Sequence, residues 1–87
     1  MTTTNQKAEK SYTHRGKPCK AVLSDDGRFL ILDDREYNRG GDAAIFSVPA
    51  GAIDDFRVHL GSAWESDSKG REALIDLIDD SGAQLRV

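Results

Sequence analysis

The sequence predicts an α+β fold in which an antiparallel β-sheet is followed by a helix. Three observations predict it. Apolar and polar residues alternate through much of the first half of the chain, as they do in half-buried strands. Asp26 and Gly27 interrupt this alternation with a dipeptide typical of β-hairpin turns. After Pro49 the apolar residues recur every three or four positions, which is the spacing of a helix.

Four strands are expected before Pro49. The first is a short edge strand over Ser11–Lys17, because Tyr12 and Thr13 suit a pleated surface and Pro18 limits central pairing. The other three strands are predicted at Cys19–Ser24, Arg28–Tyr37 and Ala43–Val48.

The long strand Arg28–Tyr37 divides its side chains between two faces, because successive residues of a strand point in opposite directions. One face carries Arg28, Leu30, Leu32, Asp34 and Glu36. The other face carries Phe29, Ile31, Asp33, Arg35 and Tyr37.

Pro49 ends strand pairing, because proline has no N–H to donate. In the helix that follows, Asp54 and Asp55 lie near the N-terminus, where the helix dipole favours negative charge. Its apolar stripe consists of Ile53, Phe56, Leu60 and Trp64. We expect this stripe to cover one face of the sheet and to leave the other face to solvent or a ligand.

The C-terminal part is expected to contain a loop at Ser66–Gly70 and a second, short helix at Arg71–Asp80. Alternation of apolar and acidic residues in Arg71–Asp80 also permits a strand, and we favour the helix. Ala83–Val87 is a short tail that could add a terminal strand. The chain is therefore divided into a disordered tail (1–10), a sheet-and-helix unit (11–65) and a C-terminal extension (66–87).

The length of 87 residues allows one domain, which buries only about 60–65% of its unfolded surface and gains from added stabilisation. Cys19 is the only cysteine, so no intrachain disulfide can form, and a reducing intracellular setting is the simpler interpretation. His14 and His59 lack metal-ligand spacing. Self-association is the remaining source of stability.

The formal net charge of −3 is unevenly distributed. Residues 1–20 carry five basic residues and one acidic residue, whereas the rest of the chain is acidic. A nucleic-acid contact would therefore need a local basic face. The chain contains no apolar run of the roughly 18–20 residues that span a bilayer, and its N-terminus lacks the apolar core of a signal peptide. We expect a soluble cytoplasmic protein.

Catalytic patterns are not found in the sequence, so we expect no enzyme and no cofactor. Cys19 could be paired with His14 or His59 as nucleophile and base, but a small apolar strand residue is the favoured interpretation. The four Asp-Asp pairs suit turns, caps and surface positions, because adjacent strand residues point to opposite faces. They begin at Asp25, Asp33, Asp54 and Asp79.

The more informative feature is the face that carries Phe29 and Tyr37 with Arg35 between them and Lys20 on the neighbouring strand. Aromatic and cationic side chains on a sheet are typical of single-stranded nucleic-acid binding, because they stack bases and neutralise phosphates. The alternative is that the two aromatic rings belong to the core or to a dimer contact.

Two segments resemble the repeat of the purine-rich-element-binding (PUR) family. Gly27–Leu32, with the sequence Gly-Arg-Phe-Leu-Ile-Leu, is similar to the family's Gly-Arg-Phe-Leu-Lys-Ile strand. Val48–Leu60 is similar to its Leu-Pro-Ala-x-x-Leu-x-Glu-Phe-Arg-x-x-Leu passage from strand to helix. The similarity covers roughly residues 11–65.

The resemblance implies a ββββα repeat and, because two repeats make one PUR domain, a homodimer. It also implies binding of single-stranded DNA or RNA, with Phe29 wedged among the bases. Arg28 and Arg57 match the family motifs too, although structural roles compete for both. The residues expected to contact nucleic acid are Lys17, Lys20, Phe29, Arg35, Tyr37 and Arg39.

The sequence departs from the family where Ile31 replaces a lysine and Asp33 follows on the same face. The lost positive charge weakens attraction for phosphate, which dominates nonspecific affinity. Two functions are therefore considered. The first is a single-stranded nucleic-acid binder, for which a regulatory role is one option, and the second is a protein-interaction module or inhibitor of the same fold.

Overall fold

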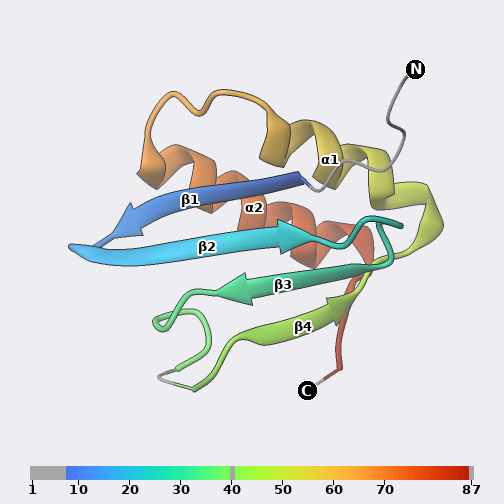
Figure 1. Ribbon diagram of the computed structural model, residues 1–87, viewed down its shortest axis with the longest axis horizontal. Coiled ribbons are helices and arrows are strands. Elements are labelled where there is room, and N and C mark those ends of the chain that lie inside the picture. Colours follow the sequence, from blue (N-terminus) through green and yellow to red (C-terminus); the bar gives the residue numbers. More distant parts are fainter. Residues whose placement is uncertain (1–7, 40, 87) are drawn as a thin grey trace.

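A five-stranded antiparallel sheet with two helices on one of its faces forms the protein (Figure 1). This computed structural model describes residues 8–39 and 41–86. The strands follow one another in the sheet in chain order: β1 (Ala8–His14), β2 (Lys17–Leu23), β3 (Phe29–Asp33), β4 (Ala44–Ser47) and β5 (Gln84–Leu85). The helices are the short 3₁₀ helix η1 (Ala50–Ala52), α1 (Ile53–Gly61) and α2 (Asp67–Ser81). The α+β class, with an antiparallel sheet followed by helices, is confirmed.

The first strand differs from the predicted one. β1 begins at Ala8 and ends at His14, and it pairs with β2 through a two-residue turn. Arg15 and Gly16 form this turn with φ values of 53° and 77°. Positive φ at both positions matches the right-handed twist of a hairpin. Ala8–His14 therefore replaces the expected strand at Ser11–Lys17 and includes the last three residues of the expected tail, whose residues 1–7 lie outside the described residues.

The turn predicted at Gly27 is confirmed. Gly27 has a φ of 79°, and its amide donates a hydrogen bond of 2.8 Å to the carbonyl of Ser24. A Cβ atom at Gly27 would overlap the side chain of Ile53 at the start of α1. Glycine therefore serves both the turn and the close approach of the helix.

The third strand ends at Asp33, four residues earlier than predicted. Residues 35–39 form a turn instead. Asp34 Oδ1 accepts the Tyr37 amide at 3.1 Å, and Asn38 Nδ2 donates to the carbonyl of Leu32 at 3.0 Å. Side-chain bonds of this kind compete with strand pairing, which is the physical reason for the early end. β4 is correspondingly shorter than the predicted Ala43–Val48.

The core lies between the sheet and the helices. Leu30 and Leu32 of β3 are fully buried against Phe56 and Leu60 of α1 and Leu74 of α2. Such burial is worth roughly 1.5–3 kcal/mol for each large apolar side chain. The expected helical stripe is therefore confirmed as far as Leu60.

Trp64 lies beyond the end of α1 at Gly61, so it does not continue the helix as predicted. Its ring centroid lies 5.3 Å from that of Tyr12, and its Nε1 donates to the carbonyl of His59 at 2.9 Å. Trp64 still packs against the core, but it does so from the connection between the helices.

Helix α2 begins at Asp67, so the loop prediction for Ser66–Gly70 is wrong beyond Ser66. Ser66 is the N-cap, and its Oγ accepts the Lys69 amide at 3.1 Å. The helix predicted at Arg71–Asp80 is confirmed within it. α2 ends at Ser81. The next residue, Gly82, is its C-cap with a φ of 86°, and the tail then adds β5 beside β4.

The outer edge of β1 lies beside the connection between α1 and α2. Asp67 Oδ2 accepts the Thr13 amide at 2.8 Å, and Lys10 Nζ donates to the carbonyl of Ser62 at 2.6 Å. The opposite edge of the sheet is β5, which has only two residues. The β5 edge is therefore short, and the β1 edge is occupied at Thr13.

Candidate nucleic-acid interface

The face of the sheet opposite the helices is open. Along β3, Leu30 and Leu32 point into the core, whereas Phe29 and Ile31 point outward and are 41% and 38% exposed. This alternation follows from the pleat of the strand. We call this surface the open face.

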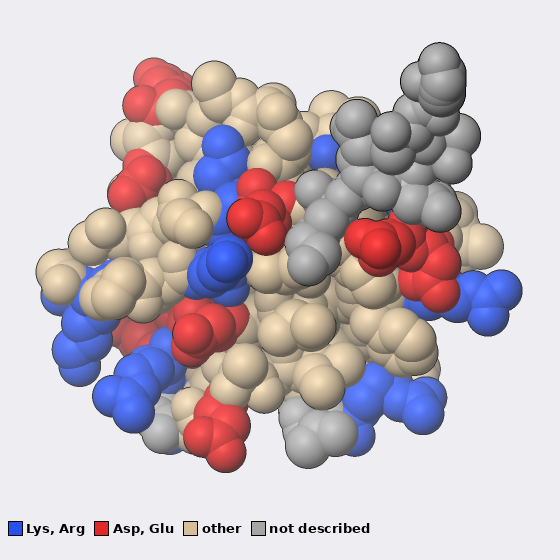
Figure 2. Space-filling model, viewed as in Figure 1, with Lys and Arg blue, Asp and Glu red and all other residues tan. Residues whose placement is uncertain are grey.

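An apolar row crosses the open face. Ile31 pairs with Val22 of β2 on one side and with Ile45 of β4 on the other. Directly opposed side chains have Cβ atoms about 4.5–5.5 Å apart, so the three β-branched residues form one surface. Figure 2 shows an uncharged area over the middle of β3 and β4, while basic and acidic side chains lie around it and over the middle of β1 and β2.

Phe29 lies at one end of the open face and is held by the β2–β3 turn. Its amide donates to Ser24 Oγ at 3.0 Å, and Ser24 Oγ donates to Asp26 Oδ1 at 2.8 Å. Asp26 also accepts the Arg28 amide at 3.0 Å, and this bond, followed by the one from Ser24, lowers the pKa of Asp26. The ring therefore projects from a turn with a fixed backbone.

A hollow of about 310 Å³ at this end of the sheet is lined by Phe29, Arg28 and Arg86, together with Ser47, Val48, Ala50 and Ile53 between the end of β4 and the start of α1. Arg28 precedes Phe29, and Arg86 is placed by its amide, which donates to the carbonyl of Ile45 at 2.7 Å. Arginine guanidinium groups bind phosphate and stack on bases. The sequence prediction missed Arg86, because its position depends on the pairing of β5 with β4.

Among the cations of β2, Lys20 lies closest to the apolar row. It is exposed on the open face, opposite Asp33 of β3, and its Nζ lies 3.9 Å from Glu9 Oε1. Exposed pairs of this kind are worth about 0–1 kcal/mol, so Lys20 can exchange Glu9 for another anion.

Tyr37 does not share the open face with Phe29. Because β3 ends at Asp33, Tyr37 lies in the following turn and is half-buried, with its ring centroid 6.2 Å from that of the core residue Phe46. Burial, with a smaller contribution from Asp79 of α2, raises the pKa of Tyr37. The predicted face of Phe29, Arg35 and Tyr37 therefore does not form.

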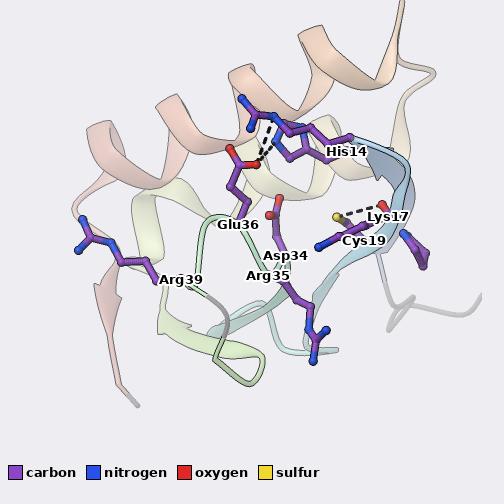
Figure 3. Close-up of a pocket in the computed structure, with 9 residues that line it drawn as sticks. His14, Lys17, Cys19, Asp34, Arg35, Glu36 and Arg39 are labelled. Atoms are coloured by element: carbon purple, nitrogen blue, oxygen red, sulfur yellow. Dashed lines mark hydrogen bonds and ion pairs between the residues drawn. The ribbon is translucent and has the colours of Figure 1, made fainter.

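The remaining predicted contacts lie at the other end of the strands. Lys17, Arg35 and Arg39 line a pocket there together with the β1–β2 turn (Figure 3). Lys17 and Lys20 are three residues apart in β2, so they point to opposite faces. The six predicted residues are thus distributed over the open face, the pocket at the other end of the strands and the edge of the core.

Asp34 was expected at the surface with its neighbour Asp33, but its side chain is buried. It accepts hydrogen bonds from Tyr12 Oη at 2.8 Å and from Arg71 Nε at 2.7 Å. Burial alone would raise the pKa of Asp34, but the bonds from Arg71, the Tyr37 amide and Tyr12 outweigh it and lower the pKa. Burial and the bond to Asp34 raise the pKa of Tyr12. This cluster serves to anchor α2.

Cys19 is buried in β2, and burial raises the pKa of its thiol, which therefore stays protonated at neutral pH. Within residues 8–39 and 41–86, no group of three or more His, Cys, Asp or Glu side chains is arranged to hold a metal ion. No helix in this part of the chain is long and apolar enough to cross a membrane.

Comparison with protein-family models, with curated proteins and with solved structures finds no match to this chain. The resemblance to the PUR repeat therefore rests on the two motifs at Gly27–Leu32 and Val48–Leu60. Nucleic-acid binding and dimer formation stay predictions.

Proposed function

We propose that the protein binds single-stranded DNA or RNA on the open face, without making or breaking a bond. The proposal is carried by one observation: the exposed ring of Phe29 borders a hollow that Arg28 and Arg86 also line. An aromatic platform flanked by cations suits stacked bases and their phosphates. The likeness to the PUR strand motif supports the same assignment for Phe29.

The apolar row extends this platform. A base stacked on Phe29 has Ile31 and Ile45 beside it, and the next sugar or base can cover Val22. Lys20 lies beyond Val22 on β2, so it is available to a phosphate further along the strand. Arg28, Arg86 and Lys20 thus provide charge at both ends of an apolar surface.

Fluorescence titration with an unphosphorylated oligothymidylate tests the proposal. Phe29→Ala should weaken binding about 5- to 150-fold, because base stacking on an aromatic ring is worth about 1–3 kcal/mol. Val58→Ala is the matched control, since Val58 is 69% exposed on α1, away from the sheet. Affinity should fall with salt, with a slope of log K against log salt near −2 for three phosphate contacts. Equal binding by the two variants would contradict the proposal.

We also propose that the protein acts as a homodimer. The PUR resemblance and the small core of an 87-residue chain support this. Sedimentation equilibrium tests it: a mass near twice 9.5 kDa is expected, and a monomer at the working concentration would contradict it.

A protein-docking module is the second candidate, and the apolar row favours it. Val22, Ile31 and Ile45 place three β-branched side chains together on an exposed surface, where a protein partner could bury them. Recovery of a partner from nuclease-treated lysate, lost on Ile31→Asp, would favour this candidate over nucleic-acid binding.

A further inference from the structure

A pocket of about 580 Å³ lies at the end of the sheet opposite Phe29. Arg15 of the β1–β2 turn and Lys17 at the start of β2 form one wall, and the segment after β3 forms the other through Arg35 and Arg39. In Figure 3, His14, Asp34 and Glu36 point toward one another at the centre, while Arg35 and Arg39 extend outward. We call this the end pocket.

The end pocket has an excess of positive charge although the protein is acidic overall. Arg15, Lys17, Arg35 and Arg39 supply four cations, and Asp34 and Glu36 supply two carboxylates. Asp34 is already neutralised, because Arg71 of α2 forms an ion pair with it at 2.7 Å. The lining therefore carries four cations against one remaining carboxylate.

Three of these cations have no ionic partner in the part of the chain that the structure describes. Lys17, Arg35 and Arg39 form no ion pair within residues 8–39 and 41–86, and all three are exposed. Their long side chains can turn into the pocket by rotation about single bonds. An anion in the pocket would thus gain ion pairs with Lys17, Arg35 and Arg39 without breaking any pair that these three cations already make.

Glu36 marks where such an anion would bind. Glu36 Oε1 lies 3.1 Å from His14 Nε2 and 3.3 Å from Arg15 Nε. Its carboxylate is half-exposed and comes from the turn after β3, so it can move aside. His14 and Arg15 already contact one carboxylate oxygen, and a stronger anion would take its place.

The geometry points to a second binding site in the end pocket, one that takes a phosphomonoester group. Such a group carries a charge between about −1.5 and −2 at neutral pH and presents three acceptor oxygens, whereas a phosphodiester within a strand carries a single charge. Arginine matches these oxygens with paired N–H donors. The excess of cations, spread over two turns, suits this dianion and disfavours a divalent metal ion.

The volume of the pocket defines the size of the ligand. About 580 Å³ lies within the range of small-molecule sites and exceeds what a bare phosphate ion fills. The apolar wall consists of Pro18 and the buried Cys19. The imidazole of His14 is the only aromatic ring in the lining. Recognition therefore depends on the phosphate, with space for a sugar or a similar attached group.

The site is separate from the open face. Lys17 and Lys20 point to opposite faces of β2, and Phe29 lies at the other end of β3. The phosphomonoester can be a free small molecule or the terminal phosphate of a nucleic-acid strand. Its binding does not require that the proposed function be correct.

The test is an NMR titration of the full chain with inorganic phosphate and with adenosine 5′-monophosphate, using adenosine and matched sodium chloride as controls. Saturable shifts are expected for the amides of residues 14–17 and 35–39 with the two phosphates only. Equal shifts with sodium chloride, or none in these two segments, would overturn the proposal.

Two variants should change phosphate binding in opposite directions. The double variant Arg35→Gln with Arg39→Gln should weaken phosphate binding at least tenfold, whereas Lys69→Gln, which removes a cation from the exposed side of α2, should leave it unchanged. Glu36→Gln should strengthen binding severalfold, because it removes the competing carboxylate. Weaker binding by Glu36→Gln would contradict the assigned position of the anion.

An oligothymidylate with and without a 5′-phosphate then identifies the source of the group. Tighter binding of the phosphorylated strand, lost in the Arg35 and Arg39 double variant, supports a strand terminus. Equal binding of both strands, together with adenosine 5′-monophosphate shifts in the end pocket, supports a free small ligand. Binding of the unphosphorylated strand itself reports only on the open face.

Discussion

Arg71 Nε and Asp34 Oδ2 lie 2.7 Å apart, and this buried ion pair joins helix α2 to the end of β3. Arg71 Nη2 also lies 3.3 Å from Asp34 Oδ1, so the contact is bidentate. The Asp34 side chain is 1% exposed, and the Tyr12 hydroxyl shares its Oδ2. Asp34 therefore connects the end of β3 to α2 through Arg71 and to β1 through Tyr12.

Removal of Arg71 should destabilise the protein strongly. Arg71→Leu leaves the Asp34 carboxylate buried without its cation, and the loss of one partner of a buried pair costs about 3–5 kcal/mol. Urea unfolding followed by tryptophan fluorescence measures the change in the free energy of unfolding.

The exposed pair between Lys69 and Glu65 provides the control for Arg71. These residues lie four positions apart with 3.5 Å between their charged atoms, and both are well exposed. Lys69→Ala should change stability by less than about 1 kcal/mol. Similar losses for the two variants would show that burial does not matter at Asp34.

Acidification should remove the contribution of Asp34. Because the pKa of Asp34 is lower in the folded state than its unfolded value near 3.9, the unfolded chain binds the proton first as the pH falls. The contribution is complete above about pH 5 and is lost as the pH falls through and below 4.

Substitution can show whether Asp34 causes the loss of stability at low pH. Asp34→Asn should lower stability at pH 7 and flatten its dependence on pH below about 4, whereas Asp33→Asn, at the exposed neighbouring position, should keep the steep dependence of the wild type. Urea midpoints measured between pH 2 and 7 provide the comparison. An unchanged slope in Asp34→Asn would assign this loss to other groups.

Gly70 and Gly61 should respond in opposite ways to alanine. A Cβ atom at Gly70 would overlap the indole of Trp64, so Gly70→Ala should cost about 1–3 kcal/mol through overpacking. At Gly61 no atom lies within 4 Å of the added Cβ, so Gly61→Ala should be neutral or stabilise by up to about 1 kcal/mol. Thermal unfolding measures both, and equal effects would contradict the close packing of Trp64 on α2.

Ile31→Lys should increase the affinity for single-stranded nucleic acid under the proposed function. The substitution adds a cation at the centre of the open face, where the similar PUR motif has lysine. The dependence of log K on log salt should steepen by about 0.7 for one more phosphate contact. Val58→Lys adds the same charge on α1 and should have less effect. Equal gains from both variants would indicate attraction to net charge alone.

The parts of the fold that were predicted correctly have local causes. The turn at Gly27 and the change from strand to helix at Pro49 depend on the backbone chemistry of single residues. The outward position of Phe29 follows from alternation along β3. These features could be derived without knowledge of the partner elements.

The parts that were missed depend on distant residues. β3 ends at Asp33, and this end removes Tyr37 from the open face. The next residue, Asp34, bonds both to the nearby Tyr37 amide and to Arg71, which is 37 residues further along the chain. Arg86 reaches the hollow beside Phe29 only because β5 pairs with β4. Alternation in one segment cannot reveal either contact, so the candidate site was predicted only in part.

The contact between the Thr13 amide and Asp67 Oδ2 has a consequence for aggregation. A foreign strand that added to β1 would need this N–H and would first have to displace the carboxylate, while β5 on the far side offers only two residues as a template. Both edges of the sheet thus disfavour the edge-to-edge strand pairing that produces fibrils. We expect the proposed homodimer to dock through side chains rather than to extend the sheet at β1.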